Sequence, residues 1–223
     1  MRRNLPFLVV TAIVLSVLVS LGNWQVRRLA EKQDYIAAIE ARIKAAPISP
    51  PHVVSEEVDQ FAAVQLTGRF TGPEIHVLVS TRDYGAGYRI IQAFEYETRR
   101  LMVDRGYIRL ESKAAPRPPA ETQILGNIHW PEERDQYTPE DDLAANIWYA
   151  RDVPKLAAAL GTEPLLIIAN ESTPSDSTIL PLPVDTSSIP NRHLEYIITW
   201  YGLAAVWVLM TLYFLTRRPK KDT

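Results

Sequence analysis

Two long uncharged segments near the ends of the chain constrain its fold more than any other feature. The first runs from Leu5 to Leu21, and the second runs from Tyr196 to Thr216. A helix rises about 1.5 Å per residue, so about 20 apolar residues cross the roughly 30 Å hydrocarbon layer of a membrane. We therefore predict transmembrane helices over residues 5–24 and 196–216. We interpret the first as an uncleaved anchor, because it lacks a small-x-small cleavage site at its end.

The charges that flank these segments predict their orientation. Arg2 and Arg3 precede the first segment, and the tail at 217–223 that follows the second contains four basic residues. Cytoplasmic flanks are enriched in Lys and Arg, so we expect both termini, 1–4 and 217–223, in the cytoplasm. The part between the two spans is then exported. We expect a bacterial inner-membrane protein with a periplasmic central domain, in contact with the lipid bilayer through both spans.

The exported part is predicted to be rich in β-strands. Residues 25–46 continue the first span as an amphipathic helical extension, whose apolar stripe packs on its own domain or on a partner helix. A Ser, Thr and Pro-rich loop at 172–195 returns the chain to the membrane. The predicted fold class is α+β, with two transmembrane helices flanking a β-rich extracytoplasmic domain at 47–171. Strands are expected at 61–70, 74–80, 89–96, 101–110, 122–130 and 165–170, with a hairpin turn at 85–87 and a short helix at 152–160.

The composition excludes several classes of function. The chain has 24 basic and 26 acidic residues, so its net charge of −2 gives no reason to expect a nucleic-acid partner. It has no cysteine, which excludes disulfides, thiolate metal sites and covalent attachment of haem through CxxCH. Its four histidines are far apart in sequence, and none lies in an HExxH or HxH motif. We find no catalytic constellation and predict that the protein is not an enzyme.

His193 differs from the other histidines in its location, three residues before the second uncharged segment. Tyr196 and Trp200 lie on the same helical face at steps of three and four residues. A neutral imidazole there could bind iron, and the two aromatic rings offer flat apolar surface to a porphyrin. Trp24 and Gln25 end the first span, and Arg27 and Arg28 could pair with haem propionates. The alternative is an aromatic belt at the membrane surface with a polar histidine among it.

The two ends of the chain carry motifs that resemble the signatures of the Surfeit locus protein family. One follows the first span and the other opens the second, in the order and topology typical of the family. The match extends over almost the whole chain, although Tyr107 stands where tryptophan is common. The matching stretches are 21–29 (LGNWQVRRL), 64–70 (VQLTGRF), 87–88 (GY), 103–107 (VDRGY) and 191–196 (NRHLEY), the last followed by 199–201 and 203–204.

This resemblance implies an assembly factor for haem-copper cytochrome c oxidase that acts on the catalytic subunit. It also implies non-covalent binding of haem a and its delivery from haem A synthase. In that case His193 is the iron ligand, and Trp24 and Gln25 match the entry motif. Two alternatives stay open. The protein is a membrane scaffold that stabilises oxidase subunits without binding haem, or it is a two-span sensor with an exported ligand domain.

Overall fold

The computed structural model describes residues 5–119, 121–187 and 189–217. The chain divides into two units, which we call the helical unit and the barrel domain. The helical unit consists of Met1–Ala38 and Thr186–Thr223, and the barrel domain is Ile39–Asp185. Arg2, Arg3 and the basic residues at 218–221, on which the predicted orientation depends, lie outside the described residues.

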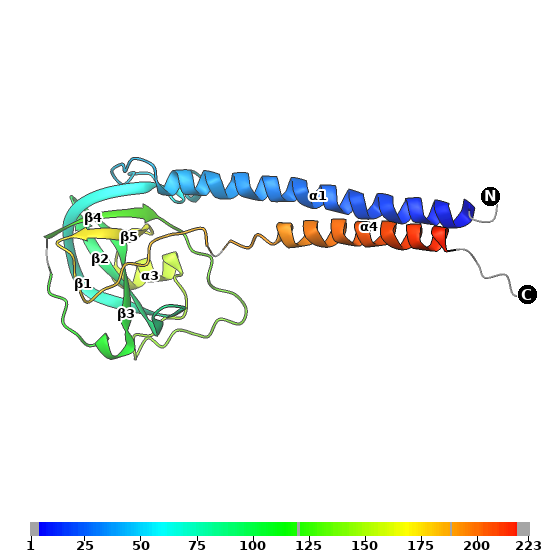
Figure 1. The fold of residues 1–223 in the computed structure, drawn as a ribbon. Coiled ribbons are helices and arrows are strands. Elements are labelled where there is room, and N and C mark those ends of the chain that lie inside the picture. The colour runs from blue at the N-terminus through cyan, green and yellow to red at the C-terminus, as the bar shows by residue number, and fades with distance from the viewer. Residues whose placement is uncertain (1–4, 120, 188, 218–223) are drawn as a thin grey trace, which may run out of the picture. The chain divides into compact units, whose positions relative to one another are not determined.

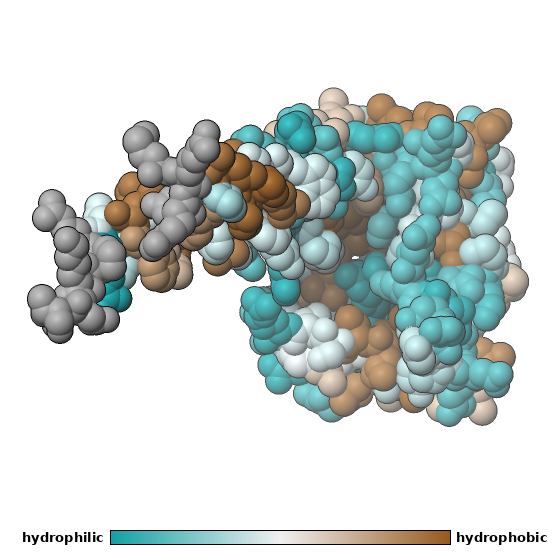
Figure 2. Space-filling view, turned by 90° about the vertical axis from the view of Figure 1, so that its right-hand side faces the viewer, coloured by the Kyte–Doolittle hydropathy of each residue, from teal (hydrophilic) through white to brown (hydrophobic). Residues whose placement is uncertain are grey.

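The helical unit contains two helices that lie side by side and run in opposite directions (Figure 1). They are α1, Leu5–Ile43, and α4, His193–Thr216. Both are long and apolar enough to cross a membrane. Around the grey atoms of the chain ends, the helices present a mostly hydrophobic surface (Figure 2). The predicted class, two candidate membrane spans flanking a β-rich domain, is confirmed.

Helix α1 continues without a break from the predicted span into the predicted extension, and it ends at Ile43 rather than at residue 46. The last carbonyl groups of a helix have no partner within the helix. Asn127 of the barrel domain donates a hydrogen bond of 3.0 Å from Nδ2 to the carbonyl oxygen of Ile43. Ile39 is buried, whereas Leu29 and Ile36 are half-buried. The end of the apolar stripe therefore packs on the chain's own domain.

The barrel domain is built on five strands that close into a barrel in the order β1-β2-β3-β5-β4. The β3–β5 pair is parallel, and the other pairs are antiparallel. Strand β5 pairs with both β3 and β4, and these two pairs close the sheet. The strands are β1, Ala63–Thr81; β2, Gly85–Tyr96; β3, Arg99–Arg109; β4, Glu121–Ile128; and β5, Leu166–Thr173.

Two details of the predicted strands were wrong. The strands expected at 61–70 and 74–80 form one strand, β1, whose register against β2 shifts between Thr71 and Glu74. A bulge accommodates the extra residues and bends the strand while the ladder continues, so Gly72 and Pro73 do not end it. The predicted turn at 85–87 is the first part of β2, and the turn itself lies at 82–84.

One apolar cluster fills the inside of the barrel. All five strands contribute to it, including Val64 of β1, Phe94 of β2, Val103 of β3, Ile124 of β4 and Ile167 of β5. Each of these five side chains is fully buried. Successive side chains of a strand point to opposite faces, so the neighbours of these residues lie on the outside of the barrel.

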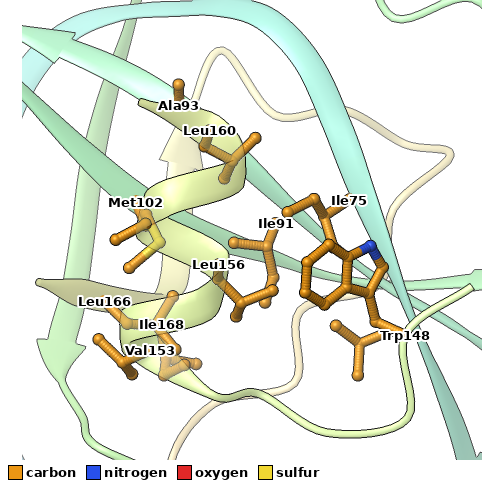
Figure 3. Packing of buried hydrophobic residues seen from close by; sticks show 12 residues of the cluster. Ile75, Ile91, Ala93, Met102, Trp148, Val153, Leu156, Leu160, Leu166 and Ile168 are labelled. Atoms are coloured by element: carbon orange, nitrogen blue, oxygen red, sulfur yellow. The ribbon is translucent and has the colours of Figure 1, made fainter. Parts of the chain in front are cut away.

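A second apolar cluster covers part of the barrel's outer face, where the helix α3, Val153–Leu160, packs on the sheet (Figure 3). The Asp152 side chain accepts a hydrogen bond from the Lys155 backbone N–H, and Gly161 ends the helix in the left-handed conformation. The predicted helix and its stop are thus confirmed. Leu166 and Ile168 of β5 pack in this outer cluster. Because the first half of β5 is covered on both faces, residues 166–169 are apolar without alternation.

Candidate ligand-binding histidine between the two helices

Close contact between α1 and α4 fixes the position of each helix along the other. Gly22 is buried, and a Cβ atom at this position would lie 2.9 to 3.1 Å from ring atoms of Tyr201. The Tyr201 hydroxyl also donates a hydrogen bond of 2.6 Å to Oδ1 of Asn23. A larger side chain at position 22 would push the two helices apart. The glycine in the 21–29 motif therefore has a packing role that its sequence position alone does not show.

The same contact brings His193 and Gln25 together, although they are 168 residues apart in sequence. His193 is the first residue of α4, and its Nδ1 lies 2.8 Å from Oε1 of Gln25. Gln25 is one of the few buried polar residues of the helical unit, with 7% of its surface exposed. The amide oxygen can only accept a hydrogen bond, so the Nδ1 atom of His193 carries the proton that it donates. In a neutral imidazole, Nε2 then has the free lone pair.

Part of the predicted apolar face around His193 packs against α1, and the rest is exposed. Ala204 is buried and Trp200 is half-buried, and both lie on the stripe of α4 that includes His193. This stripe faces α1, so it is not a free surface for a flat ligand. Tyr196 is 51% exposed and leaves its ring accessible.

The other predicted site residues are accessible. Trp24 is 47% exposed. Nη1 of Arg28 pairs with Oε2 of Glu31 at 2.7 Å, and both side chains are more than half exposed. An exposed ion pair of this kind contributes only about 0–1 kcal/mol, so Arg28 can exchange it for another anionic group.

The residues present fit one axial ligand to a haem iron. The hydrogen bond to Gln25 holds Nδ1 of His193, and in histidine ligands the nitrogen that does not bind metal is usually held in this way. In the described ranges, no group of three His, Cys, Asp or Glu side chains could hold a metal ion.

The barrel domain contains a buried charged cluster that sequence reasoning missed. Asp104 is fully buried, and its Oδ2 lies 2.7 Å from Nη1 of Arg89 and 3.4 Å from Nη1 of Arg151. Its Oδ1 accepts a hydrogen bond from the backbone N–H of Gly106. Arg151 also pairs with Glu133. The sequence signal for this cluster was a carboxylate, Asp104, within the predicted strand 101–110. Buried charges are nearly always paired, so a carboxylate in a buried strand indicates a cationic partner.

This cluster ties the segment before α3 to the barrel. Burial acts to raise the pKa of Glu133, but the hydrogen bonds and the charge of Arg151 outweigh it, so this pKa lies below its ordinary value. Arg89 also donates a hydrogen bond from Nη1 to the carbonyl oxygen of Leu182. The buried carboxylate of Asp104 thus organises β2, β3 and two loops. Its role is structural.

A second buried cluster uses one of the remaining histidines. Nε2 of His76 lies 2.8 Å from Oε1 of Glu74, and its Nδ1 lies 3.0 Å from Nδ2 of Asn146. Arg117 also donates to Oε1 of Glu74 at 2.5 Å. Both ring nitrogens of His76 are therefore engaged within the domain, whereas Nε2 of His193 has no hydrogen-bond partner among the residues that the structure describes.

His129 predicts that acid destabilises the barrel domain. Its burial, together with the positive charge of Arg151, lowers its pKa from 6.5 to about 4. Between these values the unfolded chain binds more protons than the folded one, so the free energy of unfolding falls as the pH drops from about 7 to about 4. Hydrogen exchange of the barrel strands across this range should show the fall, and His129→Gln should make it shallower. His52→Gln is the matched control, because His52 is exposed; an equal change in both variants would contradict the prediction.

The fold and the histidine site together define a class: a membrane protein with a β-barrel domain between two apolar helices, which hold one oriented imidazole. The model of the SURF1 family matches residues 12–205, and the chain belongs to this family. It is 29% identical to the SURF1-like protein of Rickettsia felis over 98% of both chains. It is 30% identical to Surfeit locus protein 1 of Rattus norvegicus, over 89% of this chain and 72% of that one. The resemblance in the terminal and central motifs is therefore confirmed.

Proposed function

We propose that this protein is an assembly factor for haem-copper cytochrome c oxidase that binds haem a through Nε2 of His193. In this proposal it receives haem a from haem A synthase and aids its insertion into the catalytic subunit. Family membership supports the role in oxidase assembly. We also propose that both termini are cytoplasmic and the barrel domain periplasmic, as the basic flanks indicate.

The observation that carries the proposal is the hydrogen bond between His193 and Gln25. A flexible surface histidine would populate both tautomers and many ring orientations. Here a buried amide oxygen holds Nδ1–H, so that the lone pair of Nε2 is the one left for a metal. Nε2 of His193 would then be the atom that ligates the iron of haem a.

A single ligand suits a protein that must release what it binds. Among the described residues, His193 is the one histidine of the helical unit, since His52, His76 and His129 all belong to the barrel domain. Tyr196 offers its exposed ring to the porphyrin edge, and Trp24 offers another at the end of the span. Binding through one histidine and apolar contacts would be weaker than binding between two protein ligands. The oxidase subunit can then compete for the iron.

The His193→Ala variant tests the proposal. We expect wild-type protein, purified from cells that make haem a, to show a Soret band and a haem a pyridine spectrum. The alanine variant should lose most of both signals, because it lacks the iron ligand. His52→Ala is the control, since His52 is exposed in the barrel domain. Stoichiometric haem a in the His193 variant would contradict the proposal.

The Gln25→Leu variant tests how His193 is oriented. Loss of an outer-shell partner typically lowers metal affinity about 10- to 100-fold, and we expect haem affinity to fall within this range. Without haem, nitrogen NMR of histidine-labelled protein should show the Nδ1–H form of His193 in the wild type and a mixture of tautomers in the variant. Gln33→Leu, at an exposed position of the same helix, should change neither result. Unchanged tautomers in Gln25→Leu would show that the hydrogen bond does not orient the ring.

One observation favours the second candidate, a scaffold that binds oxidase subunits without haem. Trp200 and Ala204 pack toward α1, so they offer less flat surface than the sequence predicts. A scaffold would co-purify with oxidase subunits, carry no stoichiometric pigment and be indifferent to His193→Ala. The same two preparations therefore separate the candidates.

A further inference from the structure

An open groove lies on the barrel domain beside α3, and we call it the α3 groove. It has a volume of about 510 Å³. Its apolar lining comes from Leu143 and Trp148 of the preceding loop and from Ala158 and Ala159 on the outer side of the helix. Two alanines on this side allow another chain to approach the helix backbone closely.

The floor of the groove is rigid. Trp148 is 6% exposed and packs in the outer apolar cluster under α3 (Figure 3). Its backbone N–H donates to the carbonyl oxygen of His76, and its carbonyl oxygen accepts from the N–H of Leu78. The loop is thereby attached to β1. A preformed surface of this kind binds without a large cost for ordering side chains.

The loop over the groove exposes two large side chains. Leu143 is 67% exposed at its rim, and Tyr137, a few residues earlier, is 81% exposed. Covering an exposed apolar side chain of this size favours association. Leu143 lies between Asp142 and Ile147, whose backbones pair across a short bridge, so its position is defined by the loop.

The surroundings of the groove are acidic. The segment 131–146 has six acidic residues and one basic residue, Arg134. The barrel domain, residues 39–185, has 14 basic and 22 acidic residues, a net charge of −8. Arg134 pairs with Asp141, and Lys155 lies 3.8 Å from Asp152, so both cations at the groove already face a carboxylate. Glu140 is exposed and forms no ion pair within the described ranges.

We propose that the α3 groove docks a segment of a partner protein in which an aliphatic side chain lies beside Lys or Arg. The aliphatic side chain packs between Leu143 and Trp148, and the cation pairs with Glu140. Charge complementarity selects this occupant, because an acidic or zwitterionic segment would meet uncompensated carboxylates. The docking site is in the barrel domain and does not depend on haem binding by His193.

Fluorescence anisotropy with two labelled peptides tests the proposal. The full chain in a neutral maltoside detergent is titrated with a peptide of alternating Leu and Lys, and with one of alternating Leu and Glu. We expect the Leu–Lys peptide to bind at least about tenfold more tightly. Leu143→Asp and Glu140→Lys should each weaken its binding by about tenfold or more.

Matched controls separate the groove from the general charge of the domain. Val53 is 89% exposed and Glu121 is also exposed, and neither lines the groove. Val53→Asp and Glu121→Lys should change the affinity less than about twofold. If these controls weaken binding as much as the groove variants, or if Leu143→Asp has no effect, the proposal is wrong.

Photo-crosslinking in intact cells identifies the class of the occupant. A benzoylphenylalanine residue replaces Leu143 in one strain and Val53 in another. We expect position 143 alone to give one discrete adduct whose mapped peptide, in another protein, contains aliphatic residues beside Lys or Arg. An adduct with a second copy of this chain, an adduct with lipid, or no adduct would each overturn the proposal.

Discussion

Replacing Asp104 with alanine should lower the free energy of unfolding of the barrel domain by about 3–5 kcal/mol, because it leaves buried cations without their counter-charge. Arg89 and Arg151 both contact the same carboxylate oxygen, and both side chains are less than 15% exposed. The backbone N–H of Gly106 loses its acceptor as well. Hydrogen exchange of the β2 and β3 strands, in the full chain under native conditions, measures this loss.

Two further variants identify charge as the cause. Asp104→Asn preserves the shape of the side chain but removes its charge, and we expect it to keep most of the loss of the alanine variant, because Arg89 and Arg151 still lack a counter-charge. Asp83→Ala removes an exposed carboxylate in the turn between β1 and β2 and should change stability by less than about 0.5 kcal/mol. A loss in Asp104→Ala no larger than that in Asp83→Ala would show that the buried cluster does not stabilise the domain.

The second large effect is expected from Gly106→Ala. Gly106 has a φ of +117°, and a Cβ atom there would lie 2.2 Å from the carbonyl oxygen of Leu180. Backbone strain and this overlap together should cost at least about 3 kcal/mol. The variant should also separate Tyr107 from Leu180, which exchange two backbone hydrogen bonds. Faster hydrogen exchange at both residues would report that separation.

Gly85→Ala distinguishes strain from overlap. Gly85 has a φ of +75°, but nothing lies within 4 Å of the position that a Cβ atom would occupy. We therefore expect a loss of only about 1 kcal/mol, which is the cost of the left-handed conformation. Equal losses in the two variants would mean that the contact with Leu180 adds nothing.

Much of the secondary structure could be predicted from local patterns. The two spans, α3 with its glycine stop, and the apolar strand β5 all have signals within a single stretch of sequence. The predictions failed where pairing with a distant strand overrode a local sequence signal. Gly72 and Pro73 are typical of a chain break, yet β1 continues past them, since β2 holds the strand on both sides of the bulge. A short stretch of sequence does not show which distant strand it pairs with.

The candidate site shows the same division. His193, Trp24 and Gln25 could be selected from residue type and from their place beside an apolar segment. That Gln25 is the hydrogen-bond partner of His193 could not be predicted in this way, because the two residues belong to different helices. The assignment of Trp200 to an open face used the helical period alone, which does not tell which side of α4 meets α1. Asp104 was missed because its two arginines come from distant parts of the chain.

The amino-acid sequence alone predicts two apolar helices around a β-rich domain, since hydrophobic length and alternation are local properties of the chain. It also determined the family, through short motifs at both ends and in the middle. Contacts in the folded chain, in contrast, establish which residue faces Nδ1 of His193, which charges share a buried carboxylate, and which apolar residues stay uncovered beside α3. Each of these depends on contacts between residues that are far apart in the sequence or belong to different helices and strands. A single stretch of sequence does not show such contacts.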